Sequence, residues 1–232
     1  MTVPVLPLEF ADARETADLA AFLARLLHYD RAAAVRMQAG GSALAVFGRP
    51  PSFEVLAIRT ARLTARHDVD ITVSAGELLE SLGPPGAEGA ATGTGALPDA
   101  VTGPPWTGVL PPRGGWRELP GLPGPVSLGA AVTTAVAEFR TRDEALPAAR
   151  RTRAERDRIG REIWSRTVGS TALPLRAVHA ALSLGFLRPA PDFPVALLAA
   201  GSWLRLRTPF GSIALRGPGG GLGALDVSVG AG

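Results

Sequence analysis

The sequence contains no cysteine and no lysine, and each absence excludes a class of chemistry. Without cysteine there can be no disulfide, no thiolate metal site and no cysteine nucleophile. Without lysine there can be no phosphate-binding loop of the GxxxxGK[ST] type. All 24 basic residues are therefore arginines. The calculated pI of about 10.7 suggests a strongly basic protein, but the net charge at pH 7 is only +3. The pI is high because almost no group has a pKa between those of histidine and arginine.

Long apolar runs are also absent. No segment reaches the roughly 18 consecutive apolar residues that a membrane span needs. The first residues, MTVPVLPLEF, lack the basic region and apolar run of a signal peptide. We therefore expect a cytoplasmic protein that has no membrane partner. A length of 232 residues, 46% of them hydrophobic, is sufficient for one large domain or two small ones with a packed core.

The first part of the chain begins with a helical pattern. Asp12 and Glu15 have the spacing of a capping box, in which a carboxylate accepts hydrogen bonds from the first free backbone N–H groups of a helix. Apolar residues then recur every three or four positions, which predicts a helix that buries one face: Leu19, Phe22, Leu23 and Leu26.

Alternation with a period of two follows, and it predicts antiparallel strands. Gly40 and Gly41 can adopt the positive φ of a tight turn, so we expect a hairpin centred on them. Further strands are expected over 53–60 and 69–73, and a second capping box begins a short helix over 74–82.

The segment 83–125 is rich in glycine, proline, alanine and threonine and shows neither period. It predicts a linker or mobile loop, pinned locally by Trp106 and Trp116. The expected organisation is thus a first α+β unit over 1–82, this linker, and a helical segment with a second α+β unit over 126–232.

Beyond the linker, apolar spacing predicts three helices, over 128–141, 148–168 and 174–186. Strand alternation resumes at Val195. The order of elements predicts an α+β protein built on antiparallel sheet.

Internal similarity indicates how the two units are related. Residues 34–47 align without gaps to 194–207, and shorter blocks extend the match with small shifts. The paired residues are Val35, Ala39, Gly41, Ser42 and Leu44 with Val195, Ala199, Gly201, Ser202 and Leu204; Phe53, Ala57 and Arg59 with Phe210, Ala214 and Arg216; and Asp70, Val73, Ala75 and Gly76 with Asp226, Val229, Ala231 and Gly232. The pattern predicts two halves related by a pseudo-two-fold axis. The alternative is that two hairpins share glycine turns and alternating aliphatic residues by chance.

Candidates for catalysis or metal binding are few. The run from His67 to Asp70 places two carboxylates on one strand face beside an imidazole, but no third ligand is evident, and a polar strand edge is the simpler interpretation. His28 and His179 have no neighbouring nucleophile or carboxylate in a recognised pattern. We therefore expect no enzyme activity, no metal and no cofactor.

An arginine-rich stretch supports an alternative hypothesis. Residues 140–166 contain nine arginines against five carboxylates. With the helix over 174–186 and the hairpin over 203–216, the region 148–216 has the element order of a winged-helix DNA-binding regulator. The phosphate contacts would come from five arginines: Arg150, Arg151, Arg153, Arg205 and Arg207. Oppositely charged pairs four residues apart favour instead a solvated helix face.

The strand segments also resemble a known family. "AAAVRMQAGGSALAVFGRP", "EVLAIRTARL" and the later "SWLRLRTPFGSIALR" are similar to the EspG family of ESX (type VII) secretion-associated proteins, which is actinobacterial. The resemblance covers about 12–82 and 172–217. It implies two related halves around an antiparallel sheet, and a cytosolic chaperone that binds a helical secretion substrate.

Protein binding is therefore the function that the sequence favours, in a chaperone or adaptor role. Such a surface needs area and shape but no reactive group. Tryptophan and arginine are enriched at interfaces, so the outward candidates on the hairpins are Arg36, Trp203, Arg205 and Arg207.

Overall fold

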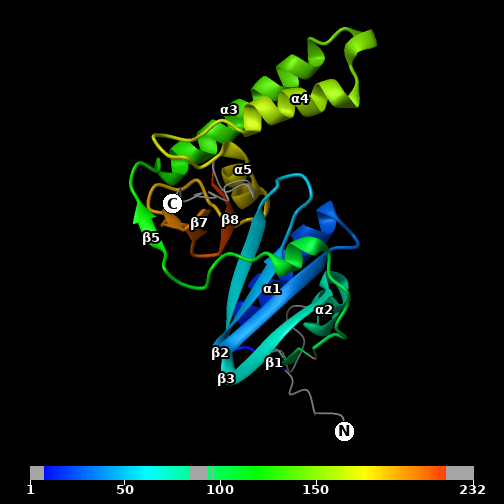
Figure 1. Cartoon of the computed structure of the whole chain (residues 1–232), viewed down its shortest axis with the longest axis vertical. Helices are drawn as coiled ribbons and strands as arrows, with labels where there is room; N and C mark the ends of the chain where they lie inside the picture. Colours follow the sequence, from blue (N-terminus) through cyan, green and yellow to red (C-terminus); the bar gives the residue numbers. More distant parts are fainter. Residues whose placement is uncertain (1–7, 84–93, 96, 218–232) are drawn as a thin grey trace, which may run out of the picture.

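The computed structural model describes residues 8–83, 94–95 and 97–217. These residues form five α-helices and a six-stranded antiparallel sheet, so the predicted α+β class is confirmed (Figure 1). None of the helices in the described ranges is long and apolar enough to cross a membrane.

The sheet has the strand order β2-β3-β8-β7-β6-β5. Its strands are β2 (Ala34–Gly48), β3 (Leu56–Ser74), β5 (Arg117–Leu119), β6 (Ala196–Ala200), β7 (Trp203–Thr208) and β8 (Gly211–Arg216). A separate pair is formed by β1 (Leu8–Glu9) and β4 (Thr94–Gly95). The only pairing between the strands of the first half and those of the second, among the described residues, joins β3 to β8 at three positions: Leu56↔Ala214, Ala57↔Ile213 and Ile58↔Ser212. We call this pairing the seam.

Helices cover one face of the sheet, which we call the back. Helix α1 (Ala13–Tyr29) packs against β3, and α5 (Leu175–Ser183) packs against β8. As predicted, Asp12 caps α1 by accepting hydrogen bonds from the backbone N–H groups of Arg14 and Glu15, at 2.9 and 3.0 Å. Ser74 caps α2 (Ala75–Ser81) in the same manner. The main core lies between these helices and the sheet.

The predicted hairpin at Gly40 and Gly41 is wrong, because β2 continues through both glycines. Gly41 has a φ of +94°, but this conformation serves a bulge rather than a turn. Gly41 pairs with His67 and Ala43 pairs with Arg62, so 63–66 of β3 lie opposite Ser42 alone. The strands predicted over 53–60 and 69–73 correspondingly belong to the single strand β3, except that 53–55 form a turn before it.

The predicted linker over 83–125 is only partly correct. Within the described residues, β5 forms an edge of the sheet and a 3₁₀-helix, η1 (Pro105–Gly108), precedes it. Segment 97–116 crosses the face of the sheet opposite α1, which we call the front (Figure 1). Trp106 and Trp116 pack there against buried residues of the sheet, so the two tryptophans do hold this segment.

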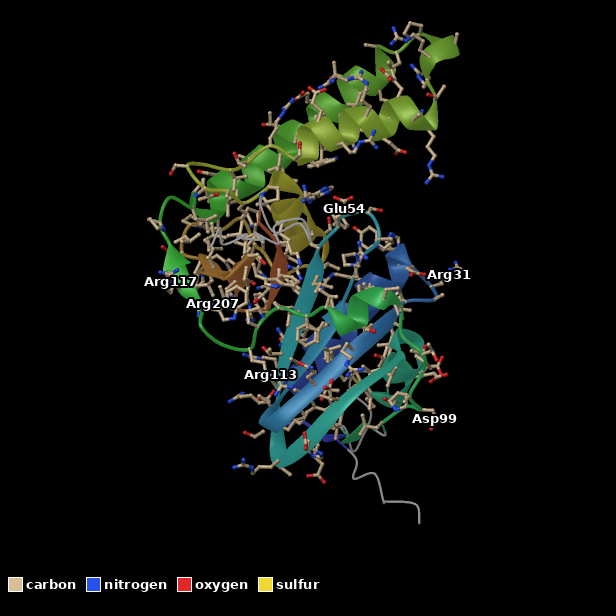
Figure 2. The ribbon with its side chains drawn as sticks, in the orientation of Figure 1. Arg31, Glu54, Asp99, Arg113, Arg117 and Arg207 are labelled. Atoms are coloured by element: carbon tan, nitrogen blue, oxygen red, sulfur yellow. The ribbon has the colours of Figure 1, made fainter. Side chains whose placement is uncertain are left out.

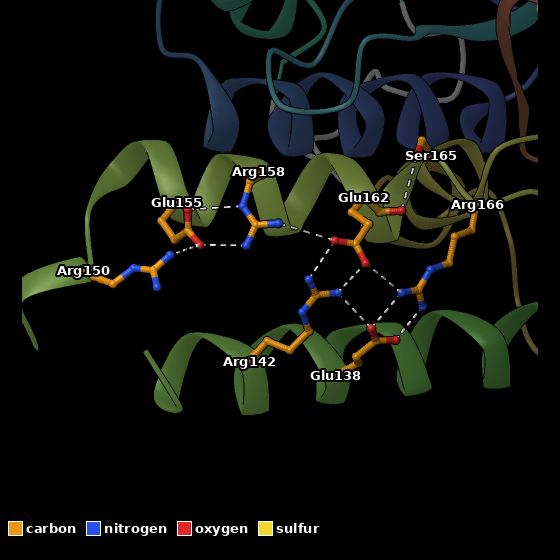
Figure 3. A network of polar contacts seen from close by, with 8 residues as sticks. All are labelled: Glu138, Arg142, Arg150, Glu155, Arg158, Glu162, Ser165 and Arg166. Atoms are coloured by element: carbon orange, nitrogen blue, oxygen red, sulfur yellow. Dashed lines mark hydrogen bonds and ion pairs between the residues drawn. The ribbon is translucent and has the colours of Figure 1, made fainter. Parts of the chain in front are cut away.

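The helices predicted in the middle of the chain form an arm. Helix α3 (Pro125–Glu144) and α4 (Arg153–Trp164) run side by side away from the sheet, with η2 (Ala148–Arg150) at the far end (Figure 1). Ion pairs link the two helices (Figure 3). Arg142 contacts Glu162 at 2.7 Å, and Arg166 donates to Glu138 at 2.7 Å. Most arginines of this stretch are therefore neutralised within the arm.

The predicted duplication is not confirmed, because 34–47 lie in the single strand β2, whereas 194–207 contain β6, a turn and most of β7. In the first aligned block, Met37 and Leu197 both lie in the core behind the sheet, as do Val46 and Leu206. In the second block, Ala57 lies in that core whereas Ala214 lies on the front, so this block does not align in the structure. The third block falls partly in 218–232, outside the described residues. The duplication therefore stays a prediction.

A buried arginine stabilises the seam from behind. Arg59 of β3 is 6% exposed, and its guanidinium donates to the carbonyl oxygen of Phe210, in the β7–β8 turn, at 2.7 Å. The same guanidinium donates to the Asp18 carboxylate of α1 at 3.0 Å and lies 3.5 Å from Glu15. One side chain thus joins α1, β3 and the second half of the sheet.

Replacing Arg59 by alanine is expected to lower the free energy of unfolding by about 3 kcal/mol, because it leaves the Phe210 carbonyl and the Asp18 carboxylate without their partner. Arg62→Ala is the matched control. Arg62 contacts the same Glu15, at 2.9 Å, but its side chain is 71% exposed, so its loss should cost less than about 1 kcal/mol. Urea denaturation measures both values. Equal losses for the two variants would contradict the structural role of Arg59.

The ion pairs of the arm should weaken in acid. Hydrogen bonds from Arg166 lower the pKa of the Glu138 carboxyl to about 2, against the opposing effect of burial and with further help from Arg142. Because the folded pKa is depressed, the stabilisation is complete above the unfolded value of about 4.3 and is lost as the pH falls towards 2.

Arg166→Gln is expected to raise the titration midpoint of Glu138 by about one pH unit, because it removes the largest cause of the depression. Arg161→Gln, in the last turns of α4, removes a charge that makes no ion pair with the described residues and should leave the midpoint unchanged. Carbon-detected NMR of the side-chain carboxyl follows both titrations. An unchanged midpoint in Arg166→Gln would show that the pairing seen here does not hold in solution.

Candidate partner-binding site on the front face

A second, smaller apolar cluster lies on the front of the sheet, directly over the seam. It consists of Phe47, Leu56, Ile58, Trp203 and Ala214, all less than 10% exposed. These residues come from β2, β3, β7 and β8, because alternate side chains of each strand point to opposite faces. The cluster therefore exists only where both halves of the sheet are joined.

Segment 97–116 covers part of this cluster and leaves a hollow beside it. The hollow has a volume of about 470 Å³ and is open to solvent. We call it the seam hollow. Its lining from the first half of the chain is Arg49, Glu54, Val55, Leu56, Pro105 and Trp106, and its lining from the rest is Val109, Arg176, Trp203, Ala214, Leu215 and Arg216. Pockets between units of this kind are frequent binding sites.

Arginines on the front stack on tryptophans. The Arg216 guanidinium lies 5.1 Å from the ring centre of Trp203 and donates to Ser202 Oγ at 3.3 Å. The Arg205 guanidinium lies 5.6 Å from the ring centre of Trp116. Burial lowers the pKa of Arg205, and the neighbouring Arg207 acts in the same direction. Both Arg205 and Arg207 lack a carboxylate within ion-pair distance among the described residues.

One side of the seam hollow contains a polar group without a hydrogen bond. The Nε atom of Arg176 is buried and has no hydrogen-bond partner in the described part of the chain. The nearest carboxylate, that of Glu54, lies 3.9 Å away. Glu54 itself has a φ of 52°, the one positive value at a non-glycine residue in the described ranges. This conformation is unfavourable for glutamate, so the surrounding loop must impose it.

The structure brings together three of the four predicted partner-binding residues. Trp203, Arg205 and Arg207 all point to the front from β7, and Figure 2 labels Arg207 among them. Arg36 lies on β2, where it contacts Asp70 at 2.7 Å and Thr72 at 3.1 Å, so its charge is already paired.

Sequence reasoning missed other residues of the seam hollow, above all Arg49, Trp106, Arg176 and Arg216. They come from a loop, a 3₁₀-helix, α5 and the end of β8. No spacing along the chain connects them, because only the seam brings their elements together. The aromatic content of the predicted linker was the one available signal.

The histidines do not form a metal or catalytic cluster in the described part of the chain. Asp70, the last carboxylate of the candidate run from His67, is engaged by Arg36 and by the Gln38 side chain at 3.1 Å. No group of three or more potential metal ligands occurs among the described residues. The ring of His179 stacks on Trp164 at 4.4 Å, and burial lowers its pKa.

The arrangement of the second half does not suit a winged helix. A recognition helix must be exposed to enter a groove of DNA, and no residue of α5 is exposed. The candidate phosphate contacts on the arm lie near carboxylates or carbonyl groups of the arm itself. Arg150 and Arg153 lie 3.8 Å from Glu155 and Asp157, and Arg151 donates to the Glu144 carbonyl at 2.8 Å.

Comparison with known proteins divides the chain at the same place as the sheet. Residues 3–108 match the family model "Domain of unknown function (DUF8010)", and residues 111–220 match "Domain of unknown function (DUF8185)". No curated protein and no solved structure gives a match. Val109, which lines the seam hollow, falls in the short interval between the two matches. The seam hollow is therefore lined by residues from both matched regions.

Proposed function

We propose that this chain is a non-catalytic protein-binding protein, and that it holds its partner on the front of the sheet at the seam hollow. The observation that carries the proposal is the composition of this surface. Apolar residues of both halves form its floor, and tryptophan and arginine surround it. Aromatic residues and arginine are enriched in the centre of protein interfaces, where they account for most of the binding energy.

Exposure of an apolar side chain at the rim supports the same proposal. Val109 is 46% exposed, although it lies beside the buried cluster. An apolar residue at the edge of an apolar hollow gains little by facing water and is covered when a partner binds.

A finer version of the proposal follows the resemblance to the EspG family. The chain would be a cytoplasmic chaperone that covers the apolar surface of a helical type VII secretion substrate until export. The order of elements supports this version: helix α1 precedes the long antiparallel strands β2 and β3, and helix α5 precedes a second set of strands in the same sheet.

Site-specific photocrosslinking in the native host tests the proposal. A photoreactive amino acid at Val109 is expected to form covalent adducts with another protein, because a bound partner covers this position. The same amino acid at Val126, on α3, is the matched control. Val126 is a valine of nearly equal exposure, 48%, and it lies outside the seam hollow.

An adduct specific to Val109 supports protein binding at the front, and mass spectrometry then identifies the partner. A small helical secreted protein among the adducts supports the chaperone version. Absence of adducts at Val109, or equal adducts at both positions, contradicts the proposed site.

A further inference from the structure

We propose that the seam hollow recognises an acidic segment of the partner, in which one bulky apolar side chain is flanked by carboxylates. This inference rests on the proposed protein-binding function and specifies the chemistry of what is bound. Its basis is the distribution of unpaired charge, together with the shape of the hollow.

The seam hollow carries a net positive charge. Its lining contains three arginines, Arg49, Arg176 and Arg216, and one carboxylate, Glu54, an excess of two (3 − 1) in a chain whose net charge is +3. Arg49 and Arg216 make no ion pair with any described residue, in contrast to most arginines of the arm. An acidic partner therefore meets two guanidinium groups without an ion pair here, beside the apolar floor of the hollow.

Arg176 offers a hydrogen-bond donor that lacks an acceptor. Its Nε–H group is buried without an acceptor, and its only nearby carboxylate is too distant for a hydrogen bond. An unpaired buried donor is unfavourable, and a carboxylate of the partner would supply the missing acceptor.

The floor of the hollow requires an apolar group as well. Leu56, Trp203 and Ala214 are buried at its base, and Trp106 forms a wall. A volume of about 470 Å³ accommodates a side chain such as leucine or phenylalanine together with adjacent backbone. The ligand must therefore combine an apolar anchor with negative charge on either side.

Nucleic acid is also anionic, but the aromatic rings are poorly placed for it. Bases bind to open sheets by stacking on exposed aromatic faces. Trp203 is 9% exposed and is covered by Arg216, and Arg205 lies over Trp116. A peptide side chain entering from the open side needs no free ring face, so the geometry favours protein.

Replacing Glu54 should change the affinity in the direction opposite to replacing the arginines. Its carboxylate lies beside Arg176 and occupies the position that a ligand carboxylate would take. Glu54→Gln should therefore strengthen binding of an acidic segment, whereas loss of the rim arginines should weaken it. Glutamine has nearly the same shape and can adopt the same backbone conformation, so the substitution changes charge with little change in packing.

The experiment selects short random peptides, displayed on yeast, for binding to the full chain. Selected peptides should carry one large apolar residue among aspartates and glutamates. Their affinity should fall about tenfold or more in the double variant Arg49→Gln, Arg216→Gln and rise about two- to fivefold in Glu54→Gln. The control double variant Arg140→Gln, Arg161→Gln removes the same charge from exposed arginines of the arm and should change nothing.

Other outcomes separate the inference from the function on which it rests. Neutral or basic peptides that lose affinity in Trp106→Ala would show binding at the seam hollow but overturn its acidic specificity. Peptides indifferent to Trp106→Ala, combined with no adducts at Val109, would overturn both. A DNA oligonucleotide could instead bind more tightly than every selected peptide, depend equally on Arg49 and Arg216, and lose affinity steeply as the salt concentration rises. That outcome would show that the hollow binds nucleic acid rather than protein.

Discussion

The pairing of β3 with β8 is the contact on which the rest of the structure depends. It involves only three residue pairs, yet it joins two groups of strands into one sheet. So short a pairing is insufficient alone, because a few hydrogen bonds contribute little net free energy. Arg59 reinforces it from the back by connecting α1 with the β7–β8 turn, and the apolar cluster with Leu56 and Trp203 reinforces it from the front. Removal of either support exposes apolar surface of both halves.

The same contact determines where a binding site can form. The two family matches end and begin within a few residues of Val109, and each covers one side of the seam. The seam hollow consists of residues from both sides, so neither matched region contains it alone. A site of this kind couples partner binding to the association of the two regions, because a ligand that binds only the joined form also stabilises it.

Local patterns in the sequence were sufficient for most helices and for the fold class. Caps at Asp12 and Ser74 and the apolar stripe of α1 depend on neighbours a few residues away, so spacing reveals them. The turn predicted at Gly40 and Gly41 failed because a glycine with positive φ serves a bulge as well as a hairpin, and only pairing with β3 decides between them. The second block of the internal alignment failed for a related reason. A tight turn joins β7 to β8, whereas a longer loop joins β2 to β3. The alignment matched identical residues across these unequal connections and therefore paired residues that face opposite sides of the sheet.

The sequence shows how many charged residues the chain has, but not which of them form ion pairs in the folded protein. Nine arginines over 140–166 indicated a cationic surface, yet Glu155 and Glu162 of the same stretch pair with several of them, and folding adds Glu138, so the free charge of the arm is reduced. Arg49, Arg205 and Arg216, which make no ion pair with a described residue, come from separate elements, and the sheet gathers these three on its front. A partner attracted by charge is thus directed to the surface where the apolar floor lies, and this coincidence of free charge with apolar area is what distinguishes a binding surface from a merely basic one.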